Sequence, residues 1–272
     1  MTILVTGATG TVGGQIVRQL VEAGHAVRAL TRDPAKAEFP AGVEVVGGDL
    51  ADPGSLAGVF DGVSAAHLIT FGGGYRTLST GREIFALAKA AGVAKVTVLR
   101  GPEDDEFTKE VAGSGVEATL LVPVEFMSNH REWAAGIIAA GRVREGFADS
   151  PSALVHEADI AAVAVAALTQ DGHGGKEYTI TGPEVLTVRE KVAVLAEALG
   201  RDIELVELSE EEVAADLAAQ GWDEASAAWM IGIRKDTPEI GYTVVDTVER
   251  VTGRPARTFA QWARENASVF GG

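Results

Sequence analysis

The sequence contains no cysteine among its 272 residues. Disulfides, thiolate nucleophiles and cysteine-ligated metals are therefore excluded, which fits a reducing compartment, and we expect a cytoplasmic protein. No apolar run is long enough to span a bilayer, and no cationic stretch precedes an apolar run near the first residue. We expect neither a membrane segment nor a signal peptide.

Positive charge is also scarce, with 23 Lys and Arg against 39 Asp and Glu and a formal net charge of −16. This balance argues against nucleic acid or an anionic membrane as a partner. A small-molecule partner fits better, and a homodimer remains open. Hydrophobic residues make up 46% of the chain, which predicts a globular protein with a sizeable core.

Glycine, by contrast, is placed in a pattern near the start of the chain. A short apolar run at residues 3–5 predicts a strand, and Gly7, Gly10 and Gly13 follow at the spacing G-x-x-G-x-x-G. Apolar residues at helical spacing continue from Val12. A strand, a glycine turn and a helix are what a diphosphate needs, because the helix N-terminus offers free N–H groups. The alternative is an ordinary turn without a ligand.

The second predicted strand, Ala26 to Thr31, ends at Arg32. In a dinucleotide-binding fold this position meets the adenosine ribose, and an Arg suits a 2′-phosphate. Arg32 therefore favours NADP(H), although Asp33 offers a carboxylate for a ribose hydroxyl. The alternative is a solvated Arg in a turn.

A third strand is predicted at residues 43–46, with Asp49 and Leu50 beyond its end. Asp49 is placed to accept a hydrogen bond from the adenine amino group, with Leu50 against the ring. Asp49 also suits the cap of a helix that begins at Pro53. Both roles remain open.

Strand and helix patterns alternate along the rest of the chain. The expected strands are 63–70, 95–99, 118–122, 177–181 and 203–206, and the expected helices are 78–91, 133–140, 159–168, 187–199 and one from 209. This alternation predicts a doubly wound α/β fold with a parallel sheet covered on both faces.

Several side chains have local roles in this pattern. Asp159, Thr187 and Ser209 are expected to cap helices. His67 lies within a strand and is expected in the core. Trp222 and Trp229 belong to an apolar stripe for which core packing is favoured over contact with a substrate.

Seven segments together resemble the atypical short-chain dehydrogenase/reductases of the NmrA-like type. They are TGATGTVG, TR and GDL after the first three strands, followed by LLVPVEFMSN, DIAAVAVAALT, YTITGPEVLT and TGRPARTFAQWARENA. The resemblance covers nearly the whole chain. It implies an extended Rossmann fold that binds NADP(H), with residues 1–130 as the core and 131–272 completing the sheet and forming a small α+β substrate lobe.

The resemblance also implies cofactor contacts. Together with Gly13 of the turn, the expected contact residues are Gly7, Thr9, Gly10, Thr11, Val12, Arg32, Asp49, Leu50, Thr70 and Pro123. No metal site is expected.

The proton donor that such reductases ordinarily use is missing. They carry a Tyr and a Lys four residues apart, but no Lys stands four residues after Tyr75, Tyr178 or Tyr242. Lys109, Tyr75 and His130 remain as weak catalytic candidates. Lys109 also suits a pair with Asp105, Tyr75 a lid, and His130 an ordinary surface position.

We therefore expect an NADPH-dependent oxidoreductase that reduces a small cyclic or aromatic carbonyl, quinone or imine-type substrate. The main alternative is a catalytically silent NADP(H) sensor that binds a partner protein. A third hypothesis is that the protein is an isomerase or lyase with the same fold.

Overall fold

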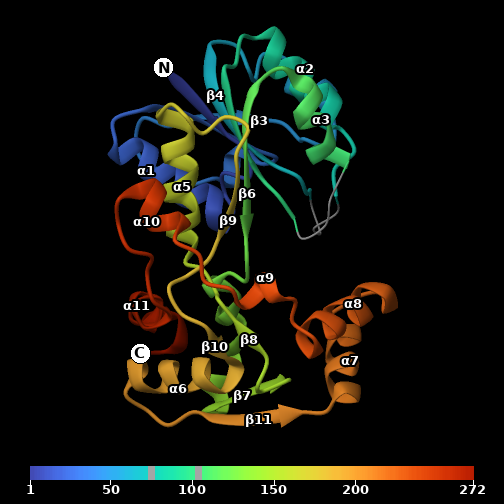
Figure 1. Cartoon of the computed structure of the whole chain (residues 1–272), viewed down its shortest axis with the longest axis vertical. Helices are drawn as coiled ribbons and strands as arrows, with labels where there is room; N and C mark the ends of the chain where they lie inside the picture. The colour runs from blue at the N-terminus through green and yellow to red at the C-terminus, as the bar shows by residue number, and fades with distance from the viewer. Residues whose placement is uncertain (73–76, 102–105) are drawn as a thin grey trace. The chain divides into compact units, whose positions relative to one another are not determined.

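The computed structural model describes residues 1–72, 77–101 and 106–272, and the chain divides into two compact units (Figure 1). Unit 1 comprises Met1–Pro123, Glu157–Ile180 and Arg250–Gly253. Unit 2 comprises Val124–His156, Thr181–Glu249 and Arg254–Gly272. Each unit is therefore built from segments that are far apart in the sequence.

Unit 1 is organised around a seven-stranded sheet of order β3-β2-β1-β4-β5-β6-β9, in which every pairing is parallel. The strands are β1 Thr2–Val5, β2 Ala26–Thr31, β3 Glu44–Gly47, β4 Val63–Ile69, β5 Lys95–Leu99, β6 Glu117–Pro123 and β9 Glu177–Ile180. The strand order reverses beside β1, so the sheet is doubly wound, and the predicted α/β class is confirmed.

Helices cover both faces of this sheet. They are α1 Thr11–Glu22, α2 Gly81–Ala90, α3 Glu106–Ser114 and α5 Glu157–Thr169, with short 3-10 turns at Pro34–Lys36 and Pro53–Leu56. α1 packs against α5, which also contacts β4, β5 and β6, while α2 packs against α3. Figure 1 shows these two pairs on opposite sides of the strands.

The core of unit 1 follows from the apolar stripes of these helices. In α1 the side chains of Val12, Ile16, Val17 and Leu20 are buried, as the 3.6-residue period requires. Burying each large side chain of this kind contributes roughly 1.5–3 kcal/mol to folding. The beginning of the chain is therefore a rigid part of the sheet.

Unit 2 contains two small two-stranded sheets and a set of helices. β10 Leu186–Thr187 pairs antiparallel with β8 Pro151–Ser152, and β11 Glu204–Leu208 pairs parallel with β7 Arg142–Gly146. The helices are a 3-10 helix Met127–Trp133, α4 Ala134–Ala140, α6 Val188–Leu199, α7 Glu210–Ala219, α8 Glu224–Lys235, α9 Glu239–Tyr242, α11 Phe259–Glu265 and a 3-10 helix Ala267–Phe270; α10 Thr247–Thr252 runs from unit 2 into unit 1.

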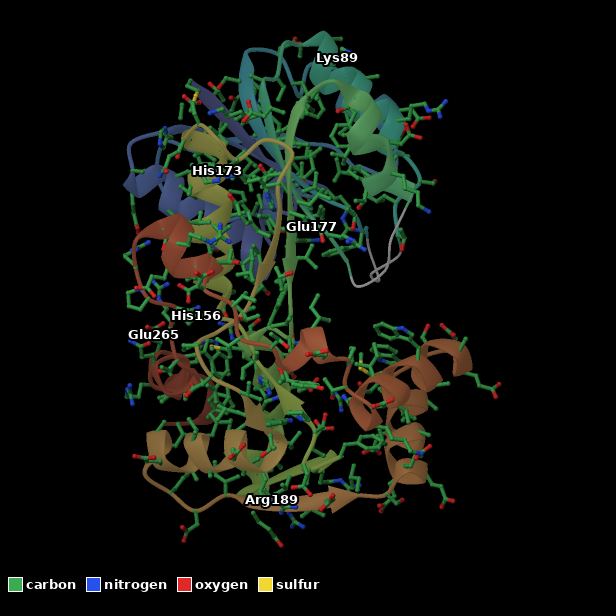
Figure 2. All side chains as sticks on the ribbon, viewed as in Figure 1. Lys89, His156, His173, Glu177, Arg189 and Glu265 are labelled. Atoms are coloured by element: carbon green, nitrogen blue, oxygen red, sulfur yellow. The ribbon has the colours of Figure 1, made fainter. Side chains whose placement is uncertain are left out.

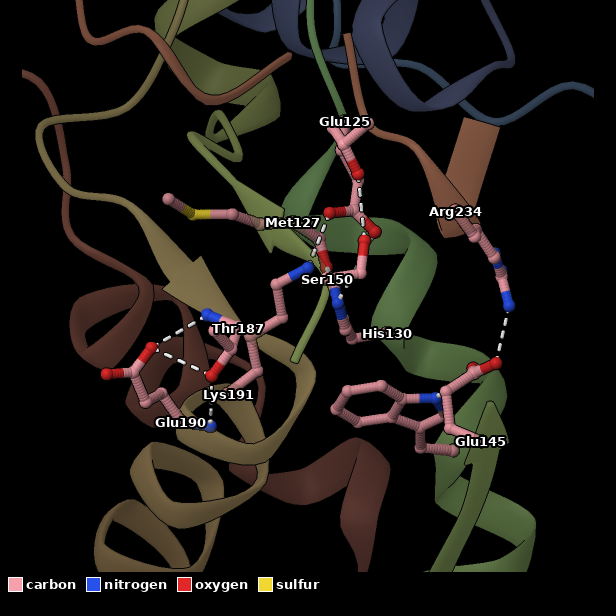
Figure 3. Close-up of polar contacts among 11 residues, drawn as sticks. Glu125, Met127, His130, Glu145, Ser150, Thr187, Glu190, Lys191 and Arg234 are labelled. Carbon is pink, nitrogen blue, oxygen red and sulfur yellow. Dashed lines mark hydrogen bonds and ion pairs between the residues drawn. The ribbon is translucent and has the colours of Figure 1, made fainter. Parts of the chain in front are cut away.

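Two predicted helix caps are confirmed. Thr187 and Glu190 form a capping box at the start of α6, which Figure 3 shows, and Ser209 forms one with Glu212 at α7. Gly200 ends α6 in the left-handed conformation, at φ 62°. These local signals act within a few residues, which is why the sequence pattern is sufficient to predict them.

Three predictions about helix starts were wrong. α2 begins at Gly81, not at Leu78, because the Leu78 N–H donates to Thr70 O and holds the chain beside the sheet. α5 begins at Glu157, so Asp159 lies inside its first turn and is not the N-cap. The turn at Pro53 is capped by Asp52, not by Asp49.

The two tryptophans expected in the core are exposed. Trp222 keeps 38% and Trp229 keeps 39% of its surface accessible, while Met230 packs against a small cluster around Val213 and Leu217. Consecutive residues of a helix point in different directions, so Trp229 and Met230 lie on different sides of α8. The predicted apolar stripe is therefore not buried as a unit in one core.

Other contacts in unit 2 tie distant segments together. Figure 2 shows His156 beside Glu265 of α11, and the His156 Nε2 atom lies 3.1 Å from the Glu265 Oε2 atom. Of the helices in the described ranges, none combines the length and apolarity needed to cross a bilayer.

Candidate functional site: a dinucleotide cradle and a buried charge cluster

The glycine turn after β1 is closed by backbone contacts. Gly7 has a φ of 58°, a conformation that favours glycine, and the Gly10 N–H donates to Gly7 O at 2.8 Å. A Cβ atom on Gly13 would lie 2.2 Å from Gly7 O. Gly13 therefore lets α1 start directly against the turn.

The N-terminus of α1 points its backbone N–H groups at the end of this turn. Gly10 is the N-cap, so no side chain is present to accept from the first turn, and the first backbone bond to it comes from the Gly14 N–H. The N–H groups of Thr11, Val12 and Gly13 come before this first intrahelical hydrogen bond. They are therefore placed to donate hydrogen bonds to an anion. The Val12 side chain is buried, so Val12 offers only its backbone, whereas Thr9 and Thr11 are exposed.

Arg32 and Asp33 follow β2 and differ in their contacts. The Asp33 carboxylate pairs with Lys36 at 2.8 Å, and the Asp33 N–H donates to Thr31 Oγ1 at 3.3 Å. The Arg32 side chain is exposed. The carboxylate is thus engaged by a local cation, while the guanidinium is accessible to an anionic ligand.

Asp49 and Leu50 follow β3. The Asp49 Oδ1 atom accepts from the Ala51 N–H at 2.9 Å, which organises the loop. Leu50 is only 6% exposed and packs in the core with Leu30 and Leu56. Leu50 therefore has only a small edge of side chain to offer an adenine ring.

Thr70 and Pro123 stand at the carboxyl ends of two parallel strands. Thr70 is buried directly after β4, and its Oγ1 atom accepts from the Gly101 N–H at 3.2 Å. Pro123 is the last residue of β6. The edge of a parallel sheet where these ends meet is where ligands bind in open α/β folds.

The weak catalytic candidates of unit 1 gain no support. Lys109 is exposed on α3. Tyr75 and Asp105 lie outside the described residues, so neither a lid role for Tyr75 nor the expected pair of Lys109 with Asp105 is tested. His67 is a core histidine, as predicted: it is fully buried and its Nδ1 atom lies 2.9 Å from Thr97 Oγ1.

His130 is buried in unit 2, so the expected surface position was wrong. Its Nδ1 atom lies 3.0 Å from Met127 O, and its ring packs edge-on against Trp133 and Phe259. Burial lowers the pKa of His130 to about 4, although the nearby Glu125 carboxylate opposes this shift. The imidazole is therefore neutral at neutral pH.

A buried ion pair lies beside His130, as Figure 3 shows. The Lys191 Nζ atom of α6 lies 2.6 Å from Glu125 Oε2, and the Glu125 Oε1 atom lies 3.7 Å from His130 Nε2. Lys191 was not among the residues that the sequence led us to expect at a site. No local signal points to it, because the two partners are 66 residues apart.

A second set of contacts holds α8 in unit 2. The Trp133 Nε1–H donates to Glu145 Oε2 at 3.2 Å, and Arg234 pairs with the other oxygen of Glu145. Figure 3 shows the pair of Arg234 with Glu145. Across residues 1–72, 77–101 and 106–272, no group of three or more His, Asp or Glu residues is arranged to hold a metal ion.

Comparisons with known proteins agree with this geometry. The NmrA-like family profile matches residues 1–98. A (4-alkanoyl-5-oxo-2,5-dihydrofuran-3-yl)methyl phosphate reductase of Streptomyces griseus is 39% identical, with 98% of this chain and 99% of that protein covered. An NAD(P)H azoreductase of Xenophilus azovorans is 36% identical, with 99% of each chain covered.

The solved structures include a close match of the fold. The NADPH-dependent quinone oxidoreductase of Escherichia coli, complexed with NADPH, superposes with a TM-score of 0.82 at 27% identity, with 97% of this chain and 99% of that chain covered. A doubly wound sheet with a glycine turn at its first helix defines a dinucleotide-binding α/β protein. The chain belongs to the NmrA-like family.

Proposed function

We propose that the protein is an NADPH-dependent reductase that transfers hydride to a small cyclic or aromatic carbonyl, quinone or imine-type substrate. The observation that carries this proposal is the turn between β1 and α1. There the close approach of Gly13 to Gly7 leaves three backbone N–H groups for a diphosphate. When bound, the nicotinamide would supply the hydride.

The residues present fit the cofactor. The N–H groups of Thr11, Val12 and Gly13 would hold the diphosphate, assisted by the exposed Thr9. Arg32 would bind the 2′-phosphate, since the Asp33 carboxylate is already paired with Lys36.

The other contact residues are placed for smaller roles. Asp49 would accept from the adenine amino group, and Leu50 would offer the edge of its side chain. Thr70 and Pro123 would border the nicotinamide end, at the carboxyl edge of the sheet.

The relatives support the substrate class. They are named for the reduction of an unsaturated furanone phosphate, of azo compounds and of quinones. These acceptors share a conjugated, electron-poor double bond. Hydride transfer to such a bond depends mainly on positioning, and water can supply the proton. The absence of a Lys four residues after any Tyr of the sequence is compatible with this chemistry.

Composition also supports three further proposals. The protein would be cytoplasmic, would bind a small molecule, and would have neither nucleic acid nor a membrane as a partner. Residues 1–130 would bind the cofactor and 131–272 would supply the substrate-binding part. A homodimer is the assembly to test first, by light scattering of the purified protein.

Titration calorimetry with NADPH and NADH tests the cofactor part of the proposal directly. We expect NADPH to bind at least ten times more tightly than NADH, because only NADPH has the 2′-phosphate that Arg32 suits. Equal affinity for both cofactors would contradict the role of Arg32, and binding of neither would contradict the proposed function.

A further inference from the structure

Thr80 is the N-cap residue of α2, yet its hydroxyl is used elsewhere. Threonine is favoured at an N-cap because its hydroxyl accepts a hydrogen bond from an N–H group of the first turn. At α2, whose residues all lie in the described part of the chain, no such side-chain bond is formed. The Thr80 hydroxyl instead donates to the backbone carbonyl of Leu50, with 2.6 Å between the two oxygens. The two residues are 30 positions apart in the sequence, so the hydroxyl serves a distant segment.

The packing of unit 1 fixes where this hydroxyl lies. A Cβ atom on Gly81, the first residue of α2, would lie 2.8 Å from the Phe107 Cα atom, so α2 begins in close contact with the backbone of α3. Ile84 and Phe85 of α2 are buried in the same hydrophobic cluster as Phe107. Interiors of this kind are closely packed and rigid. Thr80 is therefore a donor whose position is set before any ligand binds.

Leu50 lies in the segment between β3 and the 3-10 turn at Pro53–Leu56, where Asp49 is proposed to meet the adenine ring. The Asp49 N–H donates to Ser55 Oγ at 2.9 Å, a contact between residues six positions apart. Such local contacts shape the segment from within. The Thr80 bond, by contrast, joins the segment to α2 and so to the core of unit 1.

One peptide group connects Thr80 with the Asp49 carboxylate. The Thr80 hydroxyl donates to the carbonyl of the peptide between Leu50 and Ala51. The N–H of this same peptide donates to Asp49 Oδ1 at 2.9 Å. Because a peptide group is planar, fixing its carbonyl also fixes the direction of its N–H. The N–H in turn orients the carboxylate that accepts from it.

We propose that Thr80 is a positioning residue for the choice of cofactor. Through the peptide between Leu50 and Ala51 it orients the Asp49 carboxylate, and it thereby makes the protein prefer adenine over hypoxanthine at the adenosine end of the dinucleotide. With Asp49 Oδ1 held by the Ala51 N–H, the other oxygen, Oδ2, accepts from the adenine amino group.

The chemistry of the two bases makes this orientation important. Hypoxanthine has an oxygen in place of the adenine amino group, and that oxygen would face the carboxylate and repel it. Hypoxanthine also has an N–H group at the neighbouring N1 position. A carboxylate that is free to turn would bind this N–H, whereas one that is held toward the amino position would not. The preference for adenine therefore depends on what holds Asp49.

This inference rests on the proposed binding of NADPH and concerns a further property, the base that the site accepts. The opposing interpretation is that the Thr80 bond only fastens the segment after β3 to α2. Loss of the bond would then weaken the binding of any dinucleotide to the same degree. The preference between the two bases distinguishes positioning from fastening.

The probe is reduced nicotinamide hypoxanthine dinucleotide phosphate (deamino-NADPH), which differs from NADPH in the base alone. Titration calorimetry measures the Kd of each dinucleotide, and the quantity compared is the Kd of deamino-NADPH divided by the Kd of NADPH. We expect this ratio to be about ten or more for the wild type, since hydrogen bonds to charged groups contribute a factor of this size. A wild-type ratio near one would overturn the proposal.

The test variant is Thr80→Val, which keeps the shape of the side chain and removes its hydroxyl. We expect the ratio to fall by about fivefold or more, because the carboxylate is no longer held toward the amino position. Thr80→Ser keeps a hydroxyl and is expected to retain the ratio within about twofold of the wild type. A ratio in Thr80→Val within twofold of the wild type would overturn the proposal.

The matched control is Thr119→Val in β6. The Thr119 hydroxyl donates to His173 O at 2.9 Å, so this variant also removes one hydrogen bond to a backbone carbonyl of unit 1. It is expected to lower the stability in the same way as Thr80→Val and to leave the ratio unchanged. A fall of the ratio in Thr119→Val equal to that in Thr80→Val would assign the effect to general loosening of unit 1 and overturn the proposal.

A double-mutant cycle tests whether Thr80 acts through Asp49. Asp49→Ala removes the carboxylate and is expected to abolish the preference for adenine. In that background Thr80→Val should leave the ratio unaltered within about twofold, because the group that Thr80 orients is gone. A further large change of the ratio in the double variant would overturn the positioning role of Thr80.

The outcomes also separate this inference from the proposed function. If the protein shows a Thr80-dependent preference for NADPH but oxidises it with no acceptor, the reductase function is wrong and the inference stands. If NADPH is oxidised and the ratio does not depend on Thr80, the function stands and the inference is wrong. If neither dinucleotide binds, both are overturned.

Discussion

Gly13 stands so close to Gly7 that a Cβ atom on Gly13 would lie 2.2 Å from the Gly7 carbonyl oxygen and 2.7 Å from its carbonyl carbon. Both neighbours are backbone atoms of a closed turn, so they cannot move aside as a flexible side chain would. The contact fixes where α1 begins relative to β1. The N–H groups assigned to the diphosphate depend on that position.

Gly13→Ala is therefore expected to abolish measurable NADPH binding and to lower the free energy of unfolding by about 2 kcal/mol or more. Calorimetric titration and urea unfolding measure the two effects. Gly14→Ala is the matched control: its Cβ would lie 3.5 Å from Ala8 O, an ordinary contact. Normal NADPH binding in Gly13→Ala would refute the close approach.

Arg32→Ala is expected to raise the KM for NADPH by about tenfold to a hundredfold and to leave the KM for NADH within about twofold. The reason is that a charged hydrogen bond to the 2′-phosphate is worth about 1.5–3 kcal/mol. Steady-state kinetics with both cofactors measure the change. Arg18→Ala removes an exposed Arg of α1 and serves as the control for net charge. An equal change with both cofactors would contradict the assignment.

His67 predicts how stability depends on pH. Complete burial lowers the pKa of His67 to about 3, whereas in the unfolded chain it is about 6.5. Below pH 6.5 the unfolded state binds more protons than the folded state, so stability falls on acidification. Between pH 7 and pH 5 the loss from His67 is about 2 kcal/mol.

His67→Gln removes this titration and keeps a polar group for Thr97. The free energy of unfolding, measured by urea titration at pH 7 and pH 5, is expected to fall by about 2 kcal/mol less in the variant than in the wild type. His130, whose pKa is lowered to about 4, contributes a loss in the same direction in both proteins. An identical pH dependence in the two proteins would refute burial of a neutral His67.

Lys109→Met is expected to change kcat by less than about twofold. The Lys109 ammonium is exposed on α3, and a solvated surface charge contributes little. NADPH oxidation at saturating quinone measures the effect. A loss of a hundredfold or more with a normal fold would reinstate Lys109 as the proton donor.

Most of unit 1 could be predicted from sequence because its signals are local. Strands β2 and β5 have the predicted bounds, Ala26–Thr31 and Lys95–Leu99. The alternation of strands and helices was sufficient to predict the parallel sheet. The spacing of the glycines likewise predicted the turn before α1. Each of these sequence signals spans no more than about fifteen consecutive residues.

The candidate site of unit 2 could not be predicted in the same way. His130 was expected at the surface because nothing near it in sequence shows that Trp133 and, from the far end of the chain, Phe259 enclose it. Lys191 reads as an ordinary polar residue of an amphipathic helix, yet its partner Glu125 is 66 residues away. Pairing at that distance is decided by tertiary packing, which periodicity does not report.

We conclude that the glycine turn serves an NADPH-dependent reductase. The most direct measurement is the oxidation of NADPH, followed at its absorbance band, against a panel of quinones, enones, azo compounds and cyclic imines, with Arg32→Ala run in parallel. We predict turnover of at least one compound, with a KM for NADPH that Arg32→Ala raises selectively. If the protein binds NADPH tightly but no compound in the panel oxidises the bound NADPH, this conclusion is contradicted and a cofactor sensor is favoured.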